Sequence, residues 1–119
     1  MRYSNIFSRL WNASRYSLSG LIYALKNEQA FRCEAAVFFM ISALIMFLNI
    51  PFNLSSVMII AWLFVMCLEL INSSVEKAFD LIDEHYRPEI KAGKDMLSAS
   101  VFIAIICNVI LWLNILLLL

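Results

Sequence analysis

Residues 35–68 read AAVFFMISALIMFLNIPFNLSSVMIIAWLFVMCL, a run of 34 positions with no Asp, Glu, Lys or Arg. A helix needs roughly 20 apolar residues to cross about 30 Å of hydrocarbon, so this run is long enough for two spans. Near its middle lie Asn49, Pro51 and Asn53, which suit a turn. The stretch therefore predicts two membrane helices joined by a tight connection.

The whole chain has the composition of a membrane protein, because 63% of its 119 residues are hydrophobic and only 15% are charged. A second uncharged run, residues 96–119, predicts a third span. We expect one all-α domain over residues 1–119, with transmembrane helices at about 29–48, 53–83 (including a cytoplasmic extension) and 96–118. The formal net charge is zero, so no charge excess points to nucleic acid as a partner.

The N-terminal segment carries a helical pattern of its own. Its apolar side chains recur at steps of three and four residues, and its polar side chains lie largely between them. The apolar set includes Ile6, Leu10, Leu18 and Leu25. The pattern predicts an amphipathic helix at about 3–27 that lies on the membrane surface.

The basic residues predict how the chain is oriented. Five of the nine lie before or at the start of the first span, and four lie between the second and third. Positive charges favour the cytoplasmic side of a membrane. We therefore expect a cytoplasmic N-terminus and a cytoplasmic segment at 77–95, with the turn at 49–53 and the C-terminus on the far side.

Polar side chains leave the second span along one face. Residues 69–80 read ELINSSVEKAFD. At 100° per residue, the polar members of this face fall within an arc of about 80°. They are Glu69, Asn72, Glu76, Asp80 and Asp83. Because an ionisable group facing lipid is costly, we expect this face to look into a bundle or a wet cleft, with Glu69 as its deepest and most informative member.

Two further polar groups are expected at the same cytoplasmic level. Glu28, Arg32 and Glu34 begin the first span, and Lys94, Asp95 and Ser98 begin the third. Clustered carboxylates suit a divalent cation such as Mg²⁺, which leaves coordination positions for phosphate oxygens. A small cation or proton transporter would use similar parts, and a purely structural subunit would leave Glu69 without a role. The chain has no glycine-rich phosphate loop.

Several of these residues lie within longer motifs. Residues 69–76 read ELINSSVE, Asp80 comes next, and residues 92–99 read AGKDMLSA. Upstream, residues 16–21 read YSLSGL and residues 28–34 read EQAFRCE. Over essentially the whole chain, these motifs resemble the small prokaryotic integral-membrane lipid kinases, the family of diacylglycerol kinase and undecaprenol kinase.

The resemblance implies a homotrimeric bundle in the bacterial inner membrane that uses ATP with Mg²⁺. Glu34 after Phe31 and Arg32 resembles the diacylglycerol kinases, whose product is phosphatidic acid. Pro88 resembles the undecaprenol branch, which is the alternative. In the loop before Pro88, the order of His85 and its neighbouring tyrosine is reversed relative to the diacylglycerol branch, so a nucleotide contact is not carried over to His85.

The resemblance also implies roles for individual residues. Glu69 would be the catalytic base that takes the proton from the lipid hydroxyl, and Glu28 and Glu76 would hold the metal. The nucleotide would be bound by Arg9, Tyr16, Glu28, Asn72, Glu76, Asp80, Lys94 and Asp95. The lipid substrate would contact Arg9, Ser17, Ala30, Arg32, Glu34, Glu69 and Ser98.

Overall fold

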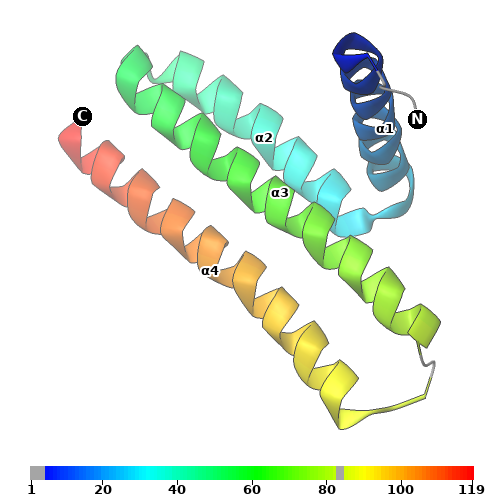
Figure 1. Cartoon of the computed structure of the whole chain (residues 1–119). Coiled ribbons are helices and arrows are strands. Elements are labelled where there is room, and N and C mark those ends of the chain that lie inside the picture. The colour runs from blue at the N-terminus through cyan, green and yellow to red at the C-terminus, as the bar shows by residue number, and fades with distance from the viewer. Residues whose placement is uncertain (1–4, 83–84) are drawn as a thin grey trace.

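The computed structural model describes residues 5–82 and 85–119 and contains four helices in those ranges. They are α1 (Ile6–Asn27), α2 (Gln29–Phe47), α3 (Phe52–Ile82) and α4 (Pro88–Leu118). Figure 1 shows α2, α3 and α4 running side by side, with α1 set apart at one end. The all-helical prediction is confirmed. Asp83 and the first positions of the predicted N-terminal helix lie outside the described residues.

Three of the helices, α2, α3 and α4, are long and apolar enough to cross a membrane, as the sequence predicted. In their most apolar windows only 17%, 22% and 17% of the residues are buried within the chain. Exposed aromatic side chains such as Phe39, Phe64 and Phe102 lie on these helices. Apolar surface of this extent suits contact with lipid tails or with other copies of the chain.

The turn between α2 and α3 forms where the asparagines and proline predicted it. Asn49 adopts a positive φ of 52°, a conformation that asparagine tolerates better than most residues. Its N–H donates to the Met46 carbonyl at 3.3 Å, and the Ile50 N–H donates to the Ile45 carbonyl at 3.2 Å. This pair of hydrogen bonds is the Schellman motif, and Ile45 packs against the apolar cluster that contains buried Ile50.

Helix α4 begins at Pro88, about two turns before residue 96, where the sequence placed the start of the third span. Proline suits the first helical position because it lacks the N–H that would otherwise have no partner. Arg87 before it has an extended backbone, with φ −135° and ψ 131°, as expected for a residue preceding proline. The extra turns place Lys91, Lys94 and Asp95 on a helix.

Helix α3 is the centre of the bundle and packs against both α2 and α4. Val65 and Met58 are fully buried on it, in two apolar clusters. Two polar side chains also join the helices. The Trp62 indole N–H donates to the Glu34 carbonyl on α2 at 2.8 Å, and Asn108 on α4 donates to the Ala61 carbonyl at 3.1 Å. Such bonds are favourable where no water competes for the donor.

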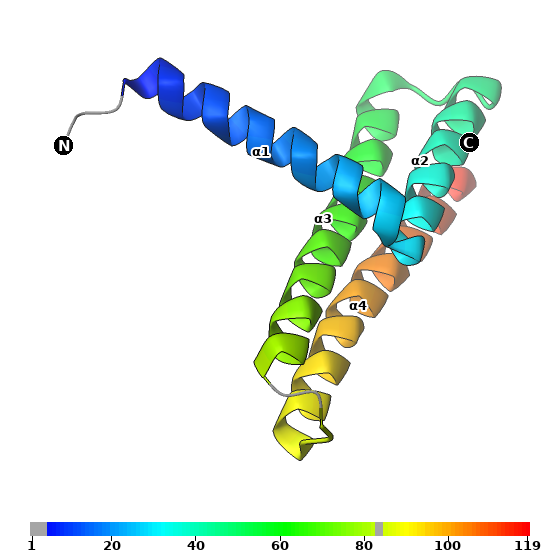
Figure 2. The ribbon, with the colours of Figure 1, turned by 90° about the vertical axis from the view of Figure 1, so that its right-hand side faces the viewer.

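Between α1 and α2 the chain turns sharply at Glu28, whose backbone is extended at φ −111° and ψ 107°. The Arg32 guanidinium donates to the carbonyls of Leu25 and Lys26 at 3.2 and 2.9 Å. It thereby satisfies two of the carbonyls left open at the end of α1. The corner sends α1 away from the bundle at a steep angle, as Figure 2 shows.

Candidate functional site

Glu69 is buried in the bundle with only 7% of its surface exposed, although it is ionisable. The Asn72 amide and the Ser73 hydroxyl donate to its Oε2 atom at 3.4 and 3.3 Å. All three residues lie on α3, one turn apart, so the helix itself brings them together. The two bonds fix the orientation of the carboxyl group.

Glu34 on α2 is the second buried carboxyl, with 8% exposed, and it interacts electrostatically with Glu69 across the helix interface. The Trp62 bond to its backbone holds this part of α2 against α3. Among the described residues, Glu34 Oε1 and Asn72 Oδ1 have no hydrogen-bond partner. Buried polar atoms are costly to leave unpaired, so these two are acceptors suited to a polar ligand.

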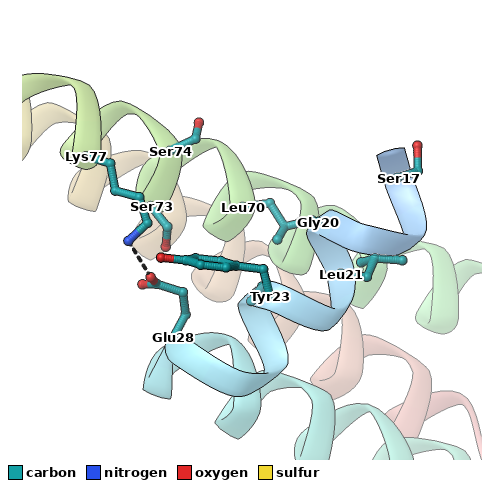
Figure 3. Close-up of a pocket in the computed structure, with 10 residues that line it drawn as sticks. Ser17, Gly20, Leu21, Tyr23, Glu28, Leu70, Ser73, Ser74 and Lys77 are labelled. Atoms are coloured by element: carbon teal, nitrogen blue, oxygen red, sulfur yellow. Dashed lines mark hydrogen bonds and ion pairs between the residues drawn. The ribbon is translucent and has the colours of Figure 1, made fainter. Parts of the chain in front are cut away.

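A pocket of about 510 Å³ lies between α1 and α3. Figure 3 shows its lining, which comes from α1, the corner at Glu28 and α3. The lining residues are Ser17, Gly20, Leu21, Tyr23, Ala24, Glu28, Leu70, Ser73, Ser74 and Lys77. Ser73 lines this pocket and also donates to Glu69, so the pocket adjoins the buried Glu69 carboxyl through one side chain.

An ion pair lies in this pocket. The Lys77 ammonium is 2.8 Å from Glu28 Oε2 and 5.4 Å from the centre of the Tyr23 ring. The hydrogen bond from Lys77 holds the pKa of the Glu28 carboxyl below its ordinary value of 4.5. Glu28 therefore remains a carboxylate at neutral pH.

The C-terminal end of α3 lies beside the first turns of α4. Lys94 is 2.8 Å from Asp80 and also interacts electrostatically with Glu76. Gly93 allows this approach, because a Cβ atom at its position would lie only 2.7 Å from the Phe79 ring. The two helix ends are therefore held in contact.

A second hollow, of about 330 Å³, lies at this end of the bundle. Its lining contains more basic than acidic side chains, a composition that suits an anionic ligand. The lining residues are Asp80, His85, Tyr86, Arg87, Ile90, Lys91 and Lys94.

The remaining predicted site residues are dispersed. Arg9 and Tyr16 are exposed on α1, and Ala30 and Ser98 are exposed on α2 and α4. Asp95 pairs with Lys91 at 2.7 Å on the surface of α4. The predicted residues thus form separate clusters within one chain, around Glu69, Glu28 and Lys94.

Sequence reasoning missed four residues of these clusters: Tyr23, Trp62, Ser73 and Lys77. Ser73 had a usable signal, because it stands four positions after Glu69, one turn along the same helix. Lys77 and Trp62 reach partners 49 and 28 positions away, so nothing in the local pattern indicates them. The interhelical contacts decide their roles.

The donor chemistry of the site suits Mg²⁺. No group of three His, Cys, Asp or Glu side chains that could hold a metal occurs in ranges 5–82 and 85–119. Mg²⁺ accompanying a nucleotide needs only one or two carboxylates, because phosphate oxygens and water complete its shell. Glu28 and Glu76 can each provide one carboxylate, and within the described residues they lie in different clusters, Glu28 with Lys77 and Glu76 with Lys94.

The fold and the site together define a helical protein with three helices able to cross a membrane and with two buried carboxyls, Glu34 and Glu69, between α2 and α3. Residues 15–116 match the family model for prokaryotic diacylglycerol kinase. The diacylglycerol kinase of Haemophilus influenzae is 41% identical over 105 residues, which cover 88% of this chain and 89% of that protein. The Escherichia coli diacylglycerol kinase is 36% identical over 106 residues, which cover 89% of this chain and 87% of that protein. The Pseudomonas aeruginosa diacylglycerol kinase is 32% identical over 109 residues, which cover 92% of this chain and 89% of that protein. The chain belongs to the prokaryotic diacylglycerol kinase family.

This membership confirms the resemblance found in the sequence motifs. The family is one of ATP-dependent lipid kinases, which favours an enzyme over the transporter and structural alternatives. A lipid substrate and a nucleotide-dependent reaction follow from the family and from the three helices able to cross a membrane.

Proposed function

We propose that this protein transfers the γ-phosphoryl group of ATP to the hydroxyl of diacylglycerol and so forms phosphatidic acid. The observation that carries the proposal is the position of Glu69. Its carboxyl group is buried, accepts hydrogen bonds from Asn72 and Ser73, and adjoins a pocket at the edge of the bundle. A lipid hydroxyl and a water-borne nucleotide can meet only at such an edge.

Glu69 is the proposed catalytic base. A base needs hydrogen-bond reach to the acceptor hydroxyl and a fixed orientation. Asn72 and Ser73 provide the orientation through Oε2. The carboxyl takes the hydroxyl proton while the lipid oxygen attacks the γ-phosphorus in line with the leaving group, and catalysis consists mainly of positioning and charge stabilisation.

The nucleotide is proposed to bind toward the cytoplasmic ends of α3 and α4. The hollow beside Lys94 and Lys91 carries the positive charge that a triphosphate requires. The proposed contacts are Arg9, Tyr16, Glu28, Asn72, Glu76, Asp80, Lys94 and Asp95. Lys94 is held by Asp80 in the structure, and we propose that it turns to the phosphates when the nucleotide arrives.

Glu28 and Glu76 are the proposed ligands of Mg²⁺. The bound ion would neutralise charge on the transferring phosphates. Both residues supply carboxylate oxygens, the donors that Mg²⁺ prefers. Glu76 lies between Glu69 and the proposed cytoplasmic end of α3, and Glu28 lies at the corner before α2.

The lipid is proposed to enter through the pocket between α1 and α3. The apolar side chains of Leu21 and Leu70 suit the glycerol end of the acyl chains, and Ser17 offers a hydroxyl at the headgroup. The proposed lipid contacts are Arg9, Ser17, Ala30, Arg32, Glu34, Glu69 and Ser98. Of these, Arg32 already holds the end of α1, which makes a structural role part of its proposed contribution.

We also propose a homotrimer in the bacterial inner membrane, as a single kinase domain over residues 1–119. The N-terminus would be cytoplasmic, the C-terminus would be on the far side, and α1 would lie on the cytoplasmic membrane surface. Support comes from the exposed apolar faces of the spans and from the distribution of Arg9 and Tyr16, which no described contact brings to Lys94. Contacts between copies would complete the site. Mixing two inactive variants, Glu69→Gln and Lys94→Met, tests this, because shared sites regain activity and independent sites do not.

The direct test gives detergent-solubilised protein Mg·ATP labelled at the γ-phosphate, with either a short-chain diacylglycerol or undecaprenol. We expect label in the diacylglycerol product and far less in undecaprenol. The reverse preference would assign the undecaprenol branch. Transfer to neither lipid would refute the kinase proposal.

A further inference from the structure

The Glu28–Lys77 ion pair bears on the proposed metal site, and the inference drawn from it rests on the proposed function. Glu28 is proposed to bind a divalent cation, yet its Oε2 atom already receives the Lys77 ammonium at 2.8 Å. Figure 3 shows the Lys77 ammonium and the Tyr23 hydroxyl pointing toward the Glu28 carboxylate inside the pocket. The position that a metal ion would take at this carboxylate is therefore occupied by the Lys77 ammonium.

The pair depends on tertiary structure and is not a neighbour contact along one helix. Its members are 49 positions apart, and they join the corner before α2 to α3. The Glu28 side chain is 22% exposed, and the Lys77 side chain is 49% exposed. The acid is thus partly enclosed, whereas the lysine reaches it from the open side on a flexible four-carbon stem.

We propose that Lys77 acts as a built-in competitor for the divalent cation at Glu28, occupying the carboxylate until the cation displaces it. An ammonium and a divalent cation that share one carboxylate repel each other. The ion therefore binds after Lys77 has swung toward solvent. Its half-exposed position and the length of its stem make that movement inexpensive.

The Glu28–Lys77 pair stabilises the site in the absence of metal. A carboxylate without a partner is costly in a partly enclosed site beside hydrocarbon. Lys77 satisfies Glu28 while the metal is away, and the ring of Tyr23 gives the ammonium a second favourable contact. The result is a site that is stable when empty of metal and binds the ion more weakly than a bare Glu28 would.

Direct binding of Mn²⁺, followed by its electron paramagnetic resonance signal, tests the proposal on the full chain in detergent without nucleotide. Lys77→Met removes the competing charge and keeps an unbranched side chain that is one heavy atom shorter. Because partly exposed ion pairs contribute only modestly, we expect Mn²⁺ to bind about fivefold more tightly to this variant. Adding Glu28→Gln to Lys77→Met should remove the gain.

Lys26→Met is the matched control, because it deletes the same charge two positions from Glu28 and Lys26 forms no ion pair with another described residue. If Lys26→Met raised the affinity for Mn²⁺ as much as Lys77→Met does, the proposed competition would be refuted in favour of a general charge effect. An unchanged or weaker affinity of Lys77→Met, or no Mn²⁺ binding to any variant, would also overturn it.

A second measurement on the wild-type chain does not depend on how the variant folds. Mass spectrometry can follow acylation of the Lys77 amine, and we expect Mn²⁺ to increase its rate several-fold, whereas competition is refuted by an unchanged rate. These outcomes are distinct from failure of the proposed function, because competition can be refuted while wild-type protein still phosphorylates diacylglycerol. Loss of the kinase proposal requires that no lipid be phosphorylated.

Discussion

Replacing Glu69 with glutamine should separate the chemistry of the site from its folding. Glutamine keeps a carbonyl oxygen that can accept from Asn72 and Ser73, but it cannot take a proton from a lipid hydroxyl. Its amide N–H can also donate toward Glu34, whose Oε1 atom has no hydrogen-bond partner among the described residues. General-base catalysis contributes about 10²- to 10⁴-fold, so the turnover rate should fall by that factor.

The same site should be sensitive to loss of the acceptor itself. Glu69→Ala leaves both donors without their partner. Hydrogen bonds to charged groups contribute about 1.5 to 3 kcal/mol at good geometry. At 3.4 and 3.3 Å these bonds are long, so we assign each about 1 kcal/mol. The free energy of unfolding should therefore fall by about 2 kcal/mol in Glu69→Ala and change by less than about 0.5 kcal/mol in Glu69→Gln.

The assay pairs two measurements in one detergent: the initial rate of phosphate transfer to diacylglycerol and the thermal unfolding midpoint. Glu34→Gln serves as the comparison, since it alters the opposing carboxyl, a proposed lipid contact, and leaves Glu69, the proposed base, in place. It should retain far more activity than Glu69→Gln. An ordinary rate in Glu69→Gln would refute its role as base, and a stability as low as that of Glu69→Ala would refute the hydrogen-bond reasoning.

Three further expectations concern stability. Trp62→Phe removes the 2.8 Å bond to the Glu34 carbonyl and should lower the free energy of unfolding by about 1 kcal/mol, seen as a lower thermal midpoint. Met58→Ala opens a cavity at a fully buried position and should lower the free energy of unfolding by about 2 to 5 kcal/mol. Phe64→Ala on the exposed face should lower it much less, and equal losses would contradict this account of the core. Because Lys77 lowers the pKa of Glu28, the ion pair should contribute stability above about pH 4.5 and lose it as the pH falls through the lowered pKa; a pH scan of the thermal midpoint should show this loss in the wild type and not in Glu28→Gln.

The sequence predicted the fold class because that class depends on local properties. The uncharged runs at 35–68 and 96–119 are long enough to span a bilayer whatever their partners are. Asn49 and Pro51 marked the turn between α2 and α3 because their backbone preferences belong to the residues themselves. The family motifs are likewise read along the chain.

The boundary of α4 was less accessible to sequence reasoning. The basic and acidic residues at 87–95 gave no apolar signal for a helix, yet α4 begins at Pro88. The N-terminal position of proline and the contact between Gly93 and Phe79 stabilise these turns. Hydropathy reports where a helix enters lipid, and it does not report where the helix begins.

What the chain determined by itself, then, is the set of apolar helices, the turn and the polar face that begins at Glu69. Only the tertiary structure decided the partners: Glu34 beside Glu69, Lys77 on Glu28 and Lys94 on Asp80. The carboxyl groups that the sequence placed at one membrane level therefore have separate partners. Each pairing depends on how two helices are rotated against each other. Helical periodicity fixes which residues share a face, whereas side-chain packing between helices fixes what that face meets.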